Sequence, residues 1–326
     1  MPIRRLTYRS LERLLKKAPS IQRDLSSIRM IIFSDHHRGD RSAADDFVQC
    51  ERTYLAALEE YFEQGYELVL LGDVEELWEN SIQKTVDSYP EVIAAERNFY
   101  LKDRLHRIWG NHDDYWRSSI LFERYFKSSF RGLKVHEGLV LKLRGEDGKN
   151  KSVLMAHGHQ GSLGSDRFST ISRFFVRVFW RYWQNLSGLK LTQPSNNLRI
   201  RSKTDEILYQ WAASKENTVL ITGHTHQPVF TSRSHLDFLR TALAEAKEPT
   251  LIARLERQIA DKEKAQSTVE VAGPRKPVYF NSGCCSFSDG DITGLEIFEG
   301  KISLVRWSSV TKKREVLVSQ ELSRVQ

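Results

Sequence analysis

The chain has few cysteines and no long apolar run. Only three cysteines stand among 326 residues, and two of them, Cys284 and Cys285, are neighbours, which does not make a disulfide framework. The longest apolar runs, such as MIIF and LVLLG, have the length of a strand, so we expect no transmembrane helix. The basic N-terminal stretch lacks the apolar core and the cleavage site of a secretory signal. These absences favour a reducing, cytoplasmic location.

Composition and charge are those of a soluble globular protein with an anionic partner. Hydrophobic residues make up 40% and charged residues 28% of the chain, which is long enough for one large domain or two small ones. The formal net charge of +7 favours a phosphorylated substrate, a nucleic acid or an acidic membrane face as the partner. Net charge by itself does not choose among these three.

Short apolar runs alternate with helical patterns in the first half of the chain. IRMIIFSD (28–35) and YELVLLGD (66–73) each read as a buried strand that ends in Asp, and LHRIWG (105–110) reads as a third strand. A helical pattern separates the first two strands, and another lies near 90–103. This alternation predicts βαβ units with parallel strands. A hairpin turn is predicted at GEDGK (145–149).

The second half adds strands and two helical insertions. Further strand patterns are NTVLITGHTH, QPVFTSR, KPVYFNSG, ITGLEIFEG and KISLVRW, which predict a mixed sheet system covered by helices. The stretch 163–212 is helical and rich in Arg and aromatic residues, and 234–270 reads as two helices. Both lie between strand-end motifs, where insertions can overhang a site. We expect a single domain over 1–326, with 163–212 as a candidate cap and 234–270 as a helical arm.

Polar clusters recur at the expected strand ends. They are SDHH (34–37), GDVEE (72–76), GNHD (110–113), AHGH (156–159) and GHTH (223–226). The carboxyl end of a strand holds a side chain in place while the following loop exposes it. The alternation of side chains along a strand puts Asp35 and His37 on one side, and the same rule places His224 and His226 together.

Seven side chains of these clusters suit a metal centre. They are Asp35, His37, Asp73, Asn111, His157, His224 and His226. Imidazole, carboxylate and amide ligands without a thiolate suit first-row divalent metals. Seven ligands are too many for one tetrahedral ion, whereas two ions about 3.5–4 Å apart with a bridging carboxylate would use them well. The pattern therefore predicts a dinuclear centre.

The series D-x-H, G-D-x-x-E, G-N-H-D, H-G-H and G-H-T-H, in this order, resembles the calcineurin-like metallophosphoesterases. The resemblance covers the chain from about residue 28 to 300, apart from the two insertions. It implies an α/β (α+β) fold, a four-layer αββα sandwich with two facing mixed β-sheets. It also implies the ligand sets: Asp35, His37 and His226 for one metal, Asn111, His157 and His224 for the other, and Asp73 as the bridge.

The resemblance implies hydrolysis of a phosphomonoester, phosphodiester or pyrophosphate bond, by in-line attack of a hydroxide that bridges two metals. Manganese is the expected ion, with Fe, Zn, Ni or Co as alternatives. His112 matches the catalytic histidine of the family that does not bind metal, and Asp113 is expected to orient it by accepting a hydrogen bond from its ring. Glu76 is expected to brace a ligand. His159 either supports a ligand or faces the substrate.

The substrate class stays open. GDVEELW and the basic helical insertion are similar to the UDP-2,3-diacylglucosamine pyrophosphatases, which act on a lipid-linked nucleotide at a membrane surface. The net charge keeps a nucleic-acid phosphodiesterase open, whereas a non-catalytic scaffold is disfavoured because no ligand position is missing. The stretch ISRFFVRVFWRYW (171–183) either packs on the domain, contacts a membrane or lends Arg to a phosphate. Peripheral contact at the inner membrane face is therefore the alternative to a freely cytoplasmic location.

Overall fold

The computed structural model describes most of the chain. The described residues are 2–145, 150–161, 198–226, 228–230 and 276–324, with single positions between 243 and 259. Residues 146–149 of the predicted turn, the whole stretch 171–183 and most of both predicted insertions lie outside them. The cap, the arm and the single domain therefore stay predictions. Within the described residues, no helix combines the length and the apolar character needed to cross a membrane.

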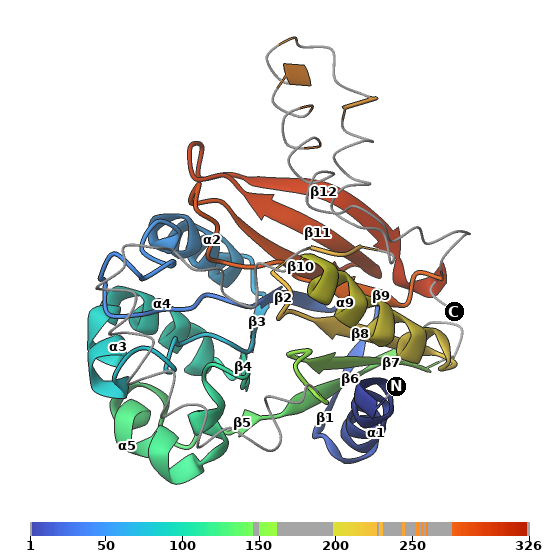
Figure 1. Cartoon of the computed structure of the whole chain (residues 1–326), viewed down its shortest axis with the longest axis horizontal. Helices are drawn as coiled ribbons and strands as arrows, with labels where there is room; N and C mark the ends of the chain where they lie inside the picture. Colours follow the sequence, from blue (N-terminus) through green and yellow to red (C-terminus); the bar gives the residue numbers. More distant parts are fainter. Residues whose placement is uncertain are drawn as a thin grey trace.

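Two mixed β-sheets face each other in the described part of the chain (Figure 1). The larger sheet has the strand order β12 (Arg314–Glu321), β11 (Lys301–Trp307), β10 (Ile292–Phe298), β2 (Arg29–Phe33), β3 (Glu67–Leu71), β4 (Leu105–Ile108) and β5 (Val135–His136). The smaller sheet has the order β1 (Ser20–Asp24), β6 (Gly138–Arg144), β7 (Asn150–Ala156), β8 (Thr218–Thr222) and β9 (Tyr279–Asn281). Strands β2 to β4 run parallel, as predicted from the βαβ pattern, and β5 also pairs in parallel with β4, whereas β10 to β12 run antiparallel.

Side-chain alternation along β2 divides the hydrophobic core. Met30 and Ile32 join an apolar cluster with β6, β7 and β8 of the other sheet, so this cluster lies between the sheets. Ile31 and Phe33 join a second cluster with helices α2 (Glu51–Glu63), α4 (Pro90–Tyr100) and α5 (Ser119–Phe130), and α3 (Ile82–Ser88) lies beside α5. Helices α1 (Pro2–Lys17) and α9 (Leu198–Ala213) pack on the smaller sheet. The predicted four-layer fold is confirmed.

The strands end earlier than their sequence patterns suggest. Strand β2 ends at Phe33, β3 at Leu71 and β4 at Ile108, so the polar clusters lie in the loops that follow. The predicted strand QPVFTSR contributes an isolated bridge between Val229 and Asn281 within the described residues. Strands β1 and β12 were not predicted, because both are largely exposed edge strands with polar sequences.

Residues 198–212, assigned by sequence to the first insertion, belong to α9. Leu208, Trp211 and Ala212 are buried and belong to the same apolar cluster as the residues of β6, β7 and β8, and α9 contacts β8 and β9. This segment of the chain is therefore part of the core of the domain.

Glu67 is the first residue of β3 and lies at the end of the strand opposite the polar clusters. Its carboxylate is expected to make the stability of the fold depend on pH. It accepts hydrogen bonds from Arg23 Nε (2.5 Å) and lies 2.7 Å from His106 Nε2. Burial opposes ionisation of Glu67, but the hydrogen bonds with His106 and Arg23 outweigh burial and lower its pKa below the ordinary 4.5. Because the folded-state pKa is depressed, ionised Glu67 stabilises the fold above the ordinary value, and this contribution is lost as the pH falls through the folded value.

We expect Glu67→Gln to lower the free energy of unfolding by about 1 kcal/mol at neutral pH, a modest value because Arg23 is partly exposed. The difference between wild type and variant should shrink as the pH falls below 4.5. Urea denaturation at neutral and acidic pH measures both values. A difference that is the same at every pH would show that the charge of Glu67 does not contribute.

Candidate metal centre

The predicted clusters meet where the carboxyl ends of parallel strands from the two sheets converge. The loops after β2 and β3 are joined by backbone hydrogen bonds from Asp35 N to Gly72 O (3.1 Å) and from His37 N to Asp73 O (3.0 Å). In the other sheet, Gly223 N donates to His157 O (3.0 Å), which joins the loops after β7 and β8. The candidate ligands in these loops therefore lie on backbone segments that are hydrogen-bonded to the adjacent loop of the same sheet.

The backbone at five candidate ligands is left-handed. The φ angles are 53° at Asp35, 51° at His37, 50° at Asp73, 70° at His224 and 54° at His226. Few non-glycine residues adopt this conformation, and it costs free energy unless the surroundings impose it. Asp35 and His37 do lie together as expected, but the alternation of side chains along a strand is not the cause. The chain has left β2, and a repeated left-handed turn directs both side chains to the same place.

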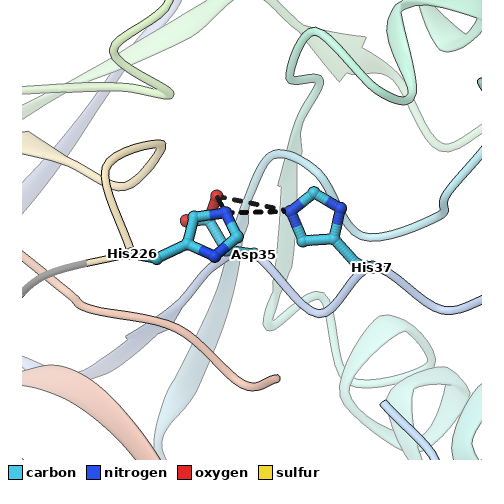
Figure 2. A group of neighbouring side chains, drawn as sticks. All are labelled: Asp35, His37 and His226. Carbon is cyan, nitrogen blue, oxygen red and sulfur yellow. Dashed lines mark hydrogen bonds and ion pairs between the residues drawn. The ribbon is translucent and has the colours of Figure 1, made fainter. Parts of the chain in front are cut away.

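Asp35, His37 and His226 form the first group of ligand atoms (Figure 2). One atom from each lies within 4.8 Å of the others. Nε2 of His37 is 3.0 Å from Nε2 of His226, and Asp35 Oδ1 is 3.3 Å from His226 Nε2 and 3.9 Å from His37 Nε2. Two imidazole nitrogens and one carboxylate oxygen therefore face a common point.

Asp73, His157 and His224 form the second group, again within 4.8 Å of one another. Asp73 Oδ2 is 2.9 Å from His157 Nε2 and 3.9 Å from His37 Nε2. The same oxygen therefore faces a nitrogen of each group. Asp73 lies between the groups, at the position that a bridging ligand would need.

Nearby carboxylates and burial set the protonation of the two histidines in the second group. Burial opposes protonation of His157, but Asp73 and Asp35 outweigh it and raise the pKa of His157 to about 9. Burial and the neighbouring charge of His157 lower the pKa of His224 to about 3. The Nδ1 atom of His157 lies 2.8 Å from the carbonyl oxygen of Leu71, which directs Nε2 toward the group. The carboxylates thus attract positive charge to this position.

Hydrogen bonds orient the carboxylate of Asp35. Its Oδ2 accepts from Ser34 Oγ (2.5 Å) and from the backbone N of His224 (2.9 Å). Its Oδ1 is buried and accepts no hydrogen bond within the described residues. Ser286 Oγ donates to the backbone oxygen of Asp35 (2.9 Å), so the loop after β9 supports the left-handed turn. Only Oδ1 is left to face a cation.

The loop after β9 also contains the two adjacent cysteines. Cys284 and Cys285 are buried free thiols. Burial raises the pKa of Cys284 to about 12, so the thiol stays protonated at neutral pH. The backbone N of Cys285 donates to the carbonyl oxygens of Ser34 and Asp35 (3.1 and 3.2 Å). The backbone of this loop, not its sulfur atoms, supports the site.

Asn111 follows β4 beside Asp73. The backbone N of the next residue, His112, donates to Asp73 Oδ1 (2.8 Å), and the preceding Gly110 packs so closely that an added Cβ would lie 2.1 Å from the same oxygen. The side-chain Oδ1 of Asn111 is buried and accepts no hydrogen bond in the described part of the chain. Together with Asp35 Oδ1, it is a buried acceptor without a hydrogen-bond donor among the residues that the structure describes.

The predicted role of Asp113 is wrong. Its Oδ1 accepts from Gly110 N (2.6 Å) and its Oδ2 from Val74 N (2.9 Å), so the buried carboxylate ties two loops together. The ring of His112 instead places Nδ1 2.6 Å from Oε2 of Glu76. Asp113 does not reach the ring because both of its oxygens are directed to the backbone beneath the loops.

Glu76 holds two histidines at once. Its Oε2 lies 2.9 Å from His37 Nδ1 as well as 2.6 Å from His112 Nδ1. Burial opposes ionisation, but the nearby His112 lowers the pKa of Glu76 to about 2. The expected contact of Glu76 with a candidate ligand is present at His37. The sequence feature that could have indicated its contact with His112 is its place in G-D-x-x-E, three residues after Asp73.

The remaining histidines separate into core and site. His36 is buried against Phe47 and Tyr54, and His106 contacts Glu67, so both have structural roles. His159 is buried with its ring 5.5 Å from that of His157 and 5.2 Å from that of Trp109. It lies beside the second group. His136 is half-buried in β5, and His235 lies outside the described residues.

Comparisons with known proteins report what this chain is similar to. The sequence model for the calcineurin-like phosphoesterases matches residues 28–228. Among solved structures, the chain is similar to a single mutant of Vps29 from Entamoeba histolytica (16% identity, 90% of this chain and 99% of that chain covered, TM-score 0.32). It is also similar to vacuolar protein sorting 29 from Cryptosporidium parvum (14% identity, 90% of this chain and 97% of that chain covered, TM-score 0.35). A third similar structure is that of a predicted phosphoesterase from Streptococcus pneumoniae (13% identity, 90% of this chain and 98% of that chain covered, TM-score 0.30).

The search of curated proteins found no match. The family match covers more than half of the chain and includes every cluster from SDHH to GHTH. The chain belongs to the calcineurin-like phosphoesterase family.

Proposed function

We propose that this protein hydrolyses a phosphoric ester or anhydride bond with the help of two divalent metal ions. One observation carries the proposal: of the three groups of possible ligand atoms in the described residues, the third being His37, Glu76 and His112, those that contain Asp35 and Asp73 face each other. Asp73 Oδ2 lies between His37 Nε2 (3.9 Å) and His157 Nε2 (2.9 Å). A carboxylate oxygen shared by two sets of donors is the arrangement that a dinuclear hydrolase needs.

The residues present fit such ions. We propose the ligands in two sets: Asp35, His37 and His226 for one ion, and Asn111, His157 and His224 for the other, with Asp73 shared. Two buried oxygens, Asp35 Oδ1 and Asn111 Oδ1, have no hydrogen-bond donor among the described residues, and they support this assignment because a cation would satisfy both. The mixture of nitrogen and oxygen donors suits manganese, with iron, zinc, nickel or cobalt as alternatives.

When bound, the two ions would lower the pKa of water and neutralise charge on the phosphate oxygens. His112 is the residue of the protein that would donate a proton to the leaving group. Burial opposes its protonation, but the carboxylates of Glu76 and Asp73 outweigh burial and raise the pKa of His112. Because Nδ1 faces Glu76, Nε2 is the atom left to donate a proton to the leaving oxygen.

The charges near the site favour a small substrate over a long polyanion. Asp46 and Glu79 lie close enough to His37 for its charge to act on the pKa of both carboxyls, although burial is the larger effect and raises each pKa. When ionised, these two carboxyls would repel the many phosphates of a nucleic-acid strand more than the single phosphate group of a small ester. A scaffold without catalysis is disfavoured because each ligand position is filled by a residue that can bind metal.

The first experiment counts the ions. We expect the metal-free protein to bind two Mn²⁺ per chain in isothermal titration, and Asp35→Asn to bind one under the same conditions, because the first group loses its charged oxygen. The matched control is Asp24→Asn, which alters an exposed carboxylate at the end of β1 that belongs to none of the ligand groups. One ion in the wild type, or an unchanged count in Asp35→Asn, would contradict the dinuclear assignment.

The second measurement is a substrate panel with the Mn²⁺-loaded protein. It contains 4-nitrophenyl phosphate, bis(4-nitrophenyl) phosphate, a cyclic nucleotide, a nucleoside diphospho-lipid and single-stranded DNA. We expect turnover on at least one of the small or lipid-linked esters and slower turnover on DNA. Preference for DNA, with a rate that falls steeply with salt, would assign the site to nucleic acid instead.

A further inference from the structure

Trp78 lies flat against His112. The ring centroids are 4.1 Å apart and the planes differ by 18°, which is a stacked arrangement. Trp78 belongs to neither metal group, and it stands two residues after Glu76 in GDVEELW. We propose that Trp78 is a positioning residue for His112: it fixes the plane of the imidazole so that Nε2 faces the leaving oxygen. This inference rests on the hydrolytic function proposed above.

Hydrogen bonds hold the indole in place. Nε1 of Trp78 donates to the backbone oxygen of Asn111 (2.7 Å), directly before His112. The backbone N of Trp78 donates to Oε1 of Glu76 (3.1 Å), and the backbone N of Leu77 donates to the oxygen of His112 (3.3 Å). The segment after Glu76 is therefore joined to the backbone around His112 and to the carboxylate that its ring contacts.

The stacking supplies a restraint that Glu76 does not. A single contact at Nδ1 sets one corner of the imidazole but leaves the ring free to tilt about that corner. The indole face limits this tilt, and the ring of His37 bounds His112 edge-on at 4.6 Å and 82°. A proton donor must be held close to its productive geometry, because small displacements cost rate. Trp78 therefore acts on the reaction through His112 and not by touching substrate.

The first test compares two leaving groups with the Mn²⁺-loaded protein. Phenyl phosphate releases a more basic oxygen than 4-nitrophenyl phosphate, so its cleavage depends more on proton donation. We expect Trp78→Ala to lower kcat about tenfold on phenyl phosphate, much less on 4-nitrophenyl phosphate, and to leave KM unchanged. Trp78→Phe keeps an aromatic face and should restore most of the rate. If Trp78 stacked on substrate instead, KM would rise.

A double-mutant cycle separates positioning from general damage. If Trp78 acts only through His112, the variant Trp78→Ala/His112→Ala should be no slower than His112→Ala alone. The matched control is Ile82→Ala, which removes a partly buried apolar side chain just after this segment without touching His112. It should keep the wild-type dependence on the leaving group. Additive losses in the cycle would overturn the proposal.

A magnetic-resonance measurement tests the stacking without metal or turnover. Protons of an imidazole that lies over an indole face are shifted upfield by its ring current. In protein labelled at histidine, we expect one imidazole, assigned through His112→Ala, to move downfield in Trp78→Ala and only partly so in Trp78→Phe. An unmoved signal would overturn the proposal. If the wild-type protein hydrolyses no ester on the panel, the proposed function fails and the inference fails with it. If the wild-type protein is active and the Trp78→Ala variant is unaffected, only the inference is rejected.

Discussion

Replacing His112 with Ala is expected to lower kcat by about 10²–10⁴-fold, the usual contribution of a positioned proton donor. This corresponds to about 3–5 kcal/mol of lost transition-state stabilisation. The reason lies in the arrangement of the ring: Nδ1 is 2.6 Å from Glu76, so Nε2 is the atom left to carry the proton toward the leaving oxygen. The loss should be larger for phenyl phosphate than for 4-nitrophenyl phosphate, measured as kcat for each ester.

His112 is not among the proposed ligands, so the variant should still bind two ions per chain. The matched control is His136→Ala, which changes a half-buried histidine in β5 and should keep wild-type turnover. Unchanged turnover in His112→Ala would refute its role as proton donor. Loss of an ion together with activity would show instead that His112 is a ligand.

Replacing Arg107 with Met is expected to lower the free energy of unfolding by about 3–5 kcal/mol, because two buried glutamates, Glu75 and Glu96, then share the single charge of Arg38. Arg107 is 1% exposed and forms an ion pair with Glu75, which also accepts a hydrogen bond from Trp116 Nε1 (2.7 Å). Arg38 lies 3.4 Å from Glu75 and 3.0 Å from Glu96. Two arginines and two glutamates thus form a buried, balanced cluster beneath the site.

Thermal or urea denaturation measures this loss. The double variant Arg107→Met/Glu75→Gln removes both charges and should recover part of the stability, since no buried charge is then left alone. Arg23→Met is the matched control, because its ion pair with Glu67 is partly exposed and should contribute no more than about 1 kcal/mol. Equal losses for Arg107→Met and Arg23→Met would show that burial does not amplify the interaction.

The fold was predictable where the sequence pattern reports burial. Met30 to Phe33 are apolar at every position because β2 is covered on both faces, and this pattern is visible in the chain itself. The edge strands β1 and β12 were missed because exposed strands contain polar residues and lack that pattern. Their pairing is decided by neighbouring strands that are distant in the sequence.

The site was predictable in its residue types but not in its contacts. The order of the five motifs identified Asp35, Asp73 and the paired histidines, because metal chemistry restricts the side chains that can serve. The assignment of Asp113 to the ring of His112 failed, since adjacency in the chain says nothing about direction. Glu76 and Trp78 reach His112 from a different strand and loop.

The sequence by itself determined the family, the two mixed sheets and the set of side chains able to bind divalent metal, because burial and ligand chemistry leave local patterns in the chain. Only the tertiary structure decided which carboxylate meets which imidazole. Left-handed turns at Asp35, His37 and Asp73 and the contact of Trp78 with His112 arise from loops packed against one another. Such contacts depend on the direction in which each loop leaves its strand, and that direction is set by the surrounding fold.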